Sequence, residues 1–114
     1  MTPGECRAAV LSRDATCQAA GLDPAAGPCY NRWGGTRVHE PEDLEIDYVR
    51  RGAVGARHEL PEDHVALCPG HHRGTGPQGG FVWATANRGL LVAHLGAGRA
   101  AVKASRAIAG DGGP

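Results

Sequence analysis

Bulky core residues are scarce in this sequence. Its 114 residues include one Phe, one Met, two Trp and two Tyr, against 18 Gly and 8 Pro. A domain of this length buries only about two-thirds of the surface of its unfolded chain. With so few large side chains, the hydrophobic core should be thin and much of the chain should be loop. We therefore expect one small domain whose folding depends on an added source of stability, such as a bound metal ion.

A charge bias and long apolar runs are also missing. Twelve basic and twelve acidic residues give a formal net charge of zero, so any surface that binds a polyanion must come from local clustering. Only one basic residue, Lys103, is a lysine; the excess of arginine suits phosphate binding or reflects a GC-rich genome. No segment reaches the roughly 18 apolar residues of a membrane span, and the N-terminus has no apolar signal core. We expect a cytoplasmic protein without a membrane partner.

The sequence contains four cysteines, which indicate either disulfides or a metal site. Two disulfides could explain them, but the lack of a signal core indicates a reducing compartment, where metal binding is the better explanation. Cys17, Cys29, Cys68 and His71 match the Cys₃His composition of structural zinc sites. The eleven residues between Cys17 and Cys29 are more than the two to four of a usual zinc knuckle. Cys6 is an alternative ligand, although its helical context favours a core position.

A second histidine directly follows the last of these ligands. The segment reads Cys68-Pro69-Gly70-His71-His72. Because neighbouring side chains at a turn point in different directions, one turn can serve both a structural metal ion and a reactive one. His72 is then left for chemistry.

The order of elements can be predicted from periodicity and from turn residues. In the strand at 44–49, alternation places Leu44 and Ile46 on the buried face and Asp47 on the opposite one. Trp83 is expected to pack in the core rather than to stack on a base. The expected elements are a helix at 5–13, a long loop at 14–35, strands at 36–39 and 44–49, a flexible basic loop at 50–57, a helical turn from 60 to 63, a breaker-rich loop at 74–80 and a helix from Thr85 to Leu95 that ends at Gly96.

This order resembles the HNH endonucleases over residues 12–95, most closely over 44–72. The resemblance consists of a knuckle cysteine, a strand ending in Asp47, a helical turn and the Cys-x-x-His-His segment. Arg13-Asp14 before the first cysteine ligand and Trp83-Ala84-Thr85 are similar to the phage and bacterial members. The resemblance implies a small α+β domain at 1–96, in which a ββα-metal unit lies within a zinc-bound treble clef with flanking helices. A partly helical or disordered tail would follow at 97–114.

The resemblance also implies roles for individual residues. Asp47 and His72 would bind a catalytic Mg²⁺, Mn²⁺ or similar ion, since a hard carboxylate and one imidazole leave positions open for phosphate and water. Tyr48 stands where the family has its general-base histidine, and the family's middle Asn falls at Asp63 or His64. A phenol is protonated at neutral pH and is a poor base. Loss of general-base catalysis costs a factor of about 10² to 10⁴ in rate.

Two functions therefore follow from the sequence. One is a metal-dependent endonuclease that hydrolyses DNA phosphodiesters and is impaired by Tyr48, or uses His39, His58 or His64 as a substitute base. The other is a non-catalytic zinc module that binds DNA or a protein partner. A histidine at position 48 is expected to raise activity by about 10² or more, provided that it reaches the reacting water. The arginines close to the site in sequence are expected either to contact phosphates or to lie on the surface: Arg50, Arg51, Arg57 and Arg73.

Overall fold

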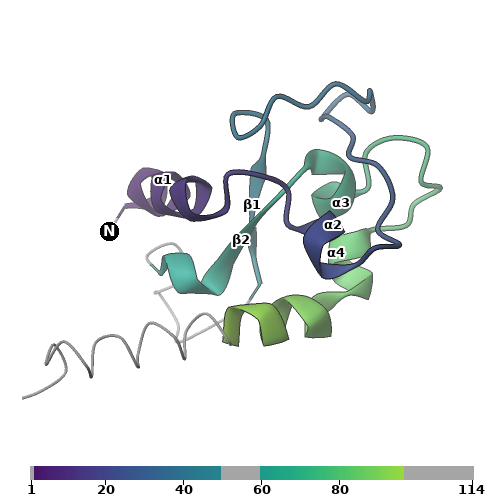
Figure 1. Cartoon of the computed structure of the whole chain (residues 1–114). Helices are drawn as coiled ribbons and strands as arrows, with labels where there is room; N and C mark the ends of the chain where they lie inside the picture. Colours follow the sequence, from purple (N-terminus) through teal and green to yellow (C-terminus); the bar gives the residue numbers. More distant parts are fainter. Residues whose placement is uncertain (1, 50–59, 97–114) are drawn as a thin grey trace, which may run out of the picture.

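The computed structural model describes residues 2–49 and 60–96 of the chain (Figure 1). The predictions for 50–57 and 97–114 lie outside these residues. Within them the fold is α+β, as predicted from the sequence, with one two-stranded antiparallel sheet and several short helices. The elements are α1 (Pro3–Asp14), α2 (Ala19–Leu22), β1 (Glu45–Tyr48), the 3₁₀ turn η1 (Pro61–Asp63), β2 (His64–Leu67), α3 (Pro69–Arg73) and α4 (Trp83–Ala86). Residues 88–96 are also helical.

The sheet pairs β1 with β2, and helices cover both of its faces. Asp47 lies opposite Val65, and Tyr48 lies opposite His64. Helix α1 packs against β2 and η1, while α3 contacts both strands; Figure 1 shows these helices on either side of the sheet. All four residues of β2 are buried as a result.

The predicted strand at 36–39 was wrong. These residues form a loop, and the segment that leads into Cys68 supplies the second strand instead. In β2, which pairs with β1, Val65 and Leu67 are completely buried. Residues 36–39, in contrast, are mostly exposed and include an arginine and a histidine. The backbone carbonyl of Arg37 is also occupied, because it accepts a hydrogen bond from the Asn31 side chain at 3.0 Å.

Helix α1 begins at a capping box and buries the face that the periodicity predicted. The Thr2 hydroxyl accepts the Glu5 N–H at 3.1 Å, and the Glu5 carboxylate accepts the Thr2 N–H at 2.9 Å. Cys6 and Val10 lie in the core. At the other end, Asp14 accepts the backbone N–H of Ala66 at 2.9 Å, so this part of the Arg13-Asp14 pair fastens α1 to β2.

Two further helical predictions needed adjustment. The helix expected from Thr85 starts two residues earlier as α4, is interrupted by a turn at Asn87 and then continues through residues 88–96, so Gly96 is itself helical. The single turn α2 lies in what was predicted to be loop. Trp83 is 2% exposed and packs in the core, as predicted. Among the described residues, no helix has both the length and the apolar character needed to cross a membrane.

Candidate metal centres

The predicted Cys₃His group is assembled in the structure. The ligand atoms of Cys17, Cys29, Cys68 and His71 all lie within 4.8 Å of one another. The Nδ1 atom of His71 is 3.6 Å from Sγ of Cys17, 3.8 Å from Sγ of Cys29 and 3.1 Å from Sγ of Cys68. Four donors at this spacing can surround one tetrahedral ion at Zn–S and Zn–N distances of about 2.3 and 2.0 Å. This group could therefore hold a metal ion such as zinc. Cys6 lies elsewhere, with its sulfur 3.8 Å from Nδ1 of His64.

Short elements bring these distant residues together. Cys68 is the N-cap of α3, and its sulfur accepts the His71 N–H at 3.3 Å. Residue 29 is held nearby because the next residue, Tyr30, accepts the Gly70 N–H at 3.0 Å through its carbonyl oxygen. The wide gap between Cys17 and Cys29 is filled by α2 and by a turn in which Ala26 donates to the Asp23 carbonyl. These two elements bring Cys29 close to Cys17, although more residues separate the two cysteines than in a usual zinc knuckle.

The far side of the His71 ring is fixed by its own partners. Its Nε2 atom lies 2.9 Å from the carbonyl oxygen of Ala26, and Trp83 packs edge-on against the ring with centroids 5.7 Å apart. A carbonyl oxygen only accepts hydrogen bonds, so Nε2 carries the proton and Nδ1 is left to face the three sulfurs. Histidines that bind metals are commonly held in this way, through the ring nitrogen that does not bind the ion.

The charges in this group also fit a cation. Hydrogen bonds from the Cys17 and Cys29 thiols hold the pKa of Cys68 well below its usual range, and hydrogen bonding to Cys17 and Cys68 raises the pKa of Cys29. Hydrogen bonding to Cys17 and Cys68 raises the pKa of His71 to about 10. One thiolate therefore opposes the ionisation of its neighbours. A divalent cation removes this conflict, because it stabilises all three sulfurs as thiolates.

The side chains of Asp47 and His72 meet on the β1 side of α3. His72 points away from the Cys₃His group, and its Nε2 atom lies 3.8 Å from Oδ1 of Asp47. Asp47 is only 7% exposed, and its Oδ2 atom is buried without a hydrogen-bond partner among the described residues. Alternation correctly placed Asp47 on the face opposite Ile46, but that face is also covered, by α3 and by Arg88. A buried carboxylate oxygen without a partner is costly, so this atom is a candidate for binding a ligand.

Glu45 fixes the orientation of the His72 ring. Its Oε1 atom is 2.8 Å from His72 Nδ1 and 2.8 Å from Nε of Arg73, and its Oε2 atom is 2.7 Å from NH2 of Arg73. A carboxylate accepts hydrogen bonds, so Nδ1 donates and Nε2 is turned toward Asp47. Two ligand atoms that share one ion at about 2.1 Å each can be at most about 4 Å apart. The separation between His72 Nε2 and Asp47 Oδ1 meets this condition.

Arg88 brings a positive charge to the same place. One of its terminal nitrogens lies 3.8 Å from Oδ1 of Asp47, and the other donates to the carbonyl oxygen of Tyr48 at 3.3 Å. Its side chain is 39% exposed, so its remaining N–H groups can reach an anion in solvent. The three groups together form a small site with one imidazole nitrogen, two carboxylate oxygens and a guanidinium.

Tyr48 is not brought to the Asp47–His72 pair. Opposite residues of an antiparallel pair share a face, and the Tyr48 ring stacks on the ring of its partner His64 with centroids 4.9 Å apart. Both rings line a pocket with Pro3 and Cys6 of α1, on the other side of the sheet from Asp47. His64 Nδ1 also lies 2.8 Å from the carbonyl oxygen of Leu60.

The other predicted residues fall in various places. His39 is exposed in the loop before β1, where its N–H donates to the Asp43 carboxylate at 2.7 Å. Asp63 is buried at the end of η1, directly before the first residue of β2. Arg73 pairs with Glu45, while His58, Arg50, Arg51 and Arg57 lie outside the described residues.

Comparison with protein families, with curated proteins and with solved structures found no match to this chain. The site therefore has to be interpreted from its own geometry. Sequence reasoning missed two of its residues, Glu45 and Arg88. The period of two along a strand places Glu45 on the same face as Asp47, and that signal was available. Nothing in the sequence marks Arg88, because its contacts with Asp47 and with the Tyr48 carbonyl exist only in the folded chain.

Proposed function

We propose that this chain is a metal-dependent DNA endonuclease of the HNH type. The observation that carries the proposal is the meeting of His72 Nε2 and Asp47 Oδ1 at 3.8 Å, beside a buried Asp47 oxygen that has no partner among the described residues. This pair adjoins the Cys₃His group through consecutive histidines of α3. The combination agrees with the sequence resemblance, in which one ion is structural and the other takes part in the reaction.

The donor atoms of the two sites favour different ions. Three cysteine sulfurs and one imidazole form a closed set for zinc. One carboxylate and one imidazole form an open set for Mg²⁺, Mn²⁺ or a similar ion, which would supply Lewis-acid stabilisation to a phosphodiester under attack. Asp47 and His72 would hold that ion, Glu45 would keep the His72 ring in place, and Arg88 would bind a phosphate oxygen.

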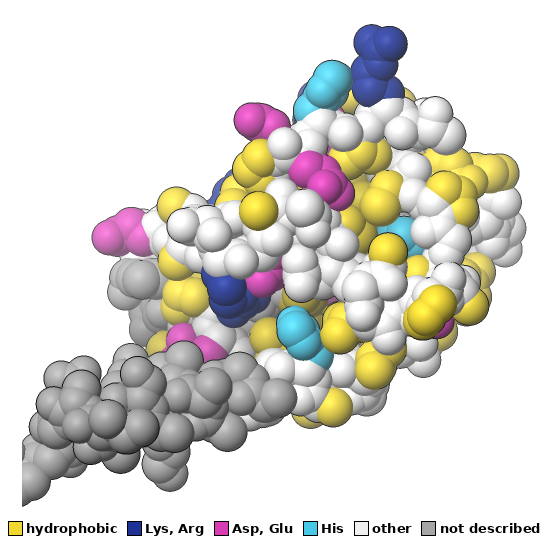
Figure 2. Space-filling model, viewed as in Figure 1, with side chains coloured by type: hydrophobic (Ala, Val, Ile, Leu, Met, Phe, Trp, Pro, Cys, Tyr) yellow, Lys and Arg dark blue, Asp and Glu magenta, His cyan; other side chains and the backbone are white. Residues whose placement is uncertain are grey.

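DNA as the substrate is inferred from the resemblance and from local arginines rather than from overall charge. Figure 2 shows acidic and basic side chains interspersed over the visible face, without one continuous basic patch. Guanidinium groups do lie close to the site, in Arg73 and Arg88. We therefore expect phosphate contacts to be few and local, and binding to be correspondingly weak at physiological salt.

The second candidate is a non-catalytic zinc module that binds DNA or a protein partner. It is favoured by the position of Tyr48, because neither this ring nor His64 shares a face with Asp47. Neither of these two residues then stands where a general base would act on water at the Asp47–His72 pair.

Nicking of supercoiled plasmid distinguishes the two candidates. The wild-type chain should convert supercoiled to open-circular DNA with Mn²⁺, Mg²⁺ or Ni²⁺, whereas Asp47→Ala and His72→Ala should lose the activity and keep one zinc per chain. Arg37→Ala is the control, because Arg37 is exposed in the loop before β1 and belongs to neither group of ligands. Equal nicking by Asp47→Ala and the wild type would contradict the assignment of the site. A wild-type chain that is inactive with all three ions would favour the non-catalytic module.

A further inference from the structure

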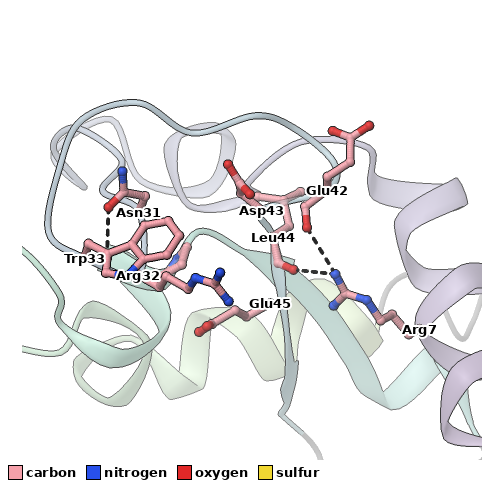
Figure 3. A pocket seen from close by; sticks show the side chains of 9 residues that line it. Arg7, Asn31, Arg32, Trp33, Glu42, Asp43, Leu44 and Glu45 are labelled. Carbon is pink, nitrogen blue, oxygen red and sulfur yellow. Dashed lines mark hydrogen bonds between the residues drawn. The ribbon is translucent and has the colours of Figure 1, made fainter.

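A pocket of about 360 Å³ lies beside the proposed reaction site, between the turn at residues 31–35 and the segment that enters β1 (Figure 3). This volume is at the lower end of the roughly 300–1,000 Å³ of small-ligand pockets. Trp33 and Arg32 lie on one wall, and Arg7 of α1 lies on the other. Glu45, which holds His72, also lines the pocket. The pocket and the Asp47–His72 pair are therefore neighbours through one shared residue.

The turn that carries Trp33 is fixed by hydrogen bonds, and its indole ring is exposed. The Asn31 side-chain oxygen accepts the N–H groups of Trp33 and Gly35, each at 2.9 Å, and the Asn31 N–H donates to the Gly35 carbonyl at 2.7 Å. Gly34 has a φ of +86°, a conformation that favours glycine. Trp33 itself is 77% exposed. A large aromatic ring displayed in solvent by a rigid turn is typical of a residue that stacks on a ligand.

The positive charges of the pocket are available to an anion. The Arg32 guanidinium lies 4.1 Å from the centroid of the Trp33 ring, and Arg32 has no ion pair among the described residues. One terminal nitrogen of Arg7 donates to the carbonyl oxygens of Glu42 and Leu44, which leaves its other N–H groups. Figure 3 shows the guanidinium ends of Arg32 and Arg7 reaching into the pocket from opposite sides.

The carboxylates of Glu42, Asp43 and Glu45 also line the pocket, so any anion site is local to the two guanidinium groups. Glu45 is already bound to Arg73 and His72, and the Asp43 carboxylate accepts the His39 N–H. In Figure 3 the carboxylates of Glu42 and Asp43 point away from Arg32. The centre of the pocket thus combines one exposed ring face with two guanidinium groups.

We propose that this pocket binds an unpaired nucleotide of a DNA strand, with the base stacked on Trp33 and the phosphate held by Arg32 and Arg7. Stacking on an aromatic ring accepts any base, so this contact gives affinity for unpaired DNA without a sequence preference. The inference rests on the proposed function, because it takes the bound strand to be the DNA on which the neighbouring Asp47–His72 pair acts. It extends that function by naming the strand contact and the form of DNA that is recognised.

Tryptophan fluorescence tests the proposal on the full chain. The chain has two tryptophans, and Trp83 is 2% exposed, so a change in the solvent-exposed emission reports on Trp33. Titration with a twelve-residue oligothymidylate, in zinc-loaded protein without added Mg²⁺ or Mn²⁺, should quench this emission. Binding of a labelled oligothymidylate should weaken about tenfold or more in Trp33→Ala and remain within about threefold of the wild type in Trp33→Phe.

The charge contact has its own matched pair of variants. Arg32→Ala should weaken binding and reduce the salt dependence by the contribution of about one phosphate, whereas Arg37→Ala, an exposed arginine outside the pocket, should change neither. Absence of quenching at saturation, or wild-type affinity in Trp33→Ala, would overturn the nucleotide site even if the chain cleaves DNA. Binding through Trp33 by a chain that cleaves nothing with Mn²⁺ would support this site and remove the nuclease activity instead.

Discussion

His71 and His72 are adjacent, yet each belongs to a different group of side chains. On the first turn of α3, the His71 ring is directed into the Cys₃His group and the His72 ring toward β1. The two orientations are fixed by separate acceptors, the Ala26 carbonyl for His71 and the Glu45 carboxylate for His72. The different directions predicted for these two adjacent side chains are therefore seen in the structure, and a substitution at His72 should leave the Cys₃His group intact.

Position 48 gives a test of which face of the strand performs the chemistry. Tyr48→His should leave plasmid nicking within about twofold of the wild type, because a side chain at this position faces His64 and α1 rather than Asp47. The general-base factor of about 10² or more that the sequence alone led us to expect needs a residue within reach of the reacting water. Parallel nicking rates of the two proteins at equal zinc content decide the matter. A rise of a hundredfold would show that residue 48 can turn toward the Asp47–His72 pair.

At the scale of elements, the sequence predicted α1, β1 and η1 because each has a local signal. Helical spacing of Cys6, Val10 and Arg13 marked α1, alternation marked β1, and the segment at 60–63 marked η1. The pairing partner of β1 has no such signal, since residues 36–39 and 64–67 are both short and only tertiary packing selects the more apolar one. Alternation gave the correct face for Asp47, but the burial of that face by α3 and Arg88 depends on tertiary packing and has no local signal.

The contact between α3 and the loop after Cys29 keeps Cys29 close to Cys68 and His71. A Cβ atom at Gly70 would lie 2.9 Å from Cβ and 3.0 Å from the backbone nitrogen of Tyr30. Because backbone cannot yield as a side-chain end does, Gly70→Ala should move the Cys29 segment away from Cys68, weaken zinc binding and lower the free energy of unfolding by about 1–3 kcal/mol. Thermal unfolding and zinc competition with a chromogenic chelator measure both effects.

The control for this prediction is Gly21→Ala. Gly21 lies within α2, and an added Cβ there meets nothing within 4 Å. Alanine is the better helix former, so this variant should be neutral or slightly more stable than the wild type. If Gly70→Ala behaved like Gly21→Ala, the close approach of α3 to Tyr30 would not be limiting for the metal site.

At the scale of the whole molecule, the Cys₃His group joins segments that are far apart in the chain. It connects the end of α1, the loop before β1 and the start of α3, all around a core with few large side chains. Its composition was predictable from the residue types, whereas the pocket at Trp33 was not, because exposure of a tryptophan becomes visible only in the folded chain. Binding of zinc by such a group is largely folding free energy, because the unfolded chain has no preformed site.

Removal of zinc should therefore unfold the domain. Apparent zinc-binding free energies of about 10–16 kcal/mol in zinc-finger peptides are comparable to the 5–15 kcal/mol total stability of a typical domain. A strong chelator should abolish the cooperative thermal transition, and Cys68→Ser should purify without zinc and largely unfolded.

Cys6→Ser is the matched control, because Cys6 is also buried but lies outside the group, so it should retain one zinc per chain. Zinc affinity should also fall with decreasing pH, because protons compete for the sulfurs and for His71. A zinc-free wild-type chain with an unchanged unfolding midpoint would contradict a structural metal, since the domain would then fold without it. A disulfide between Cys17 and Cys29 would also contradict it, because two of the four ligand thiols would then be oxidised.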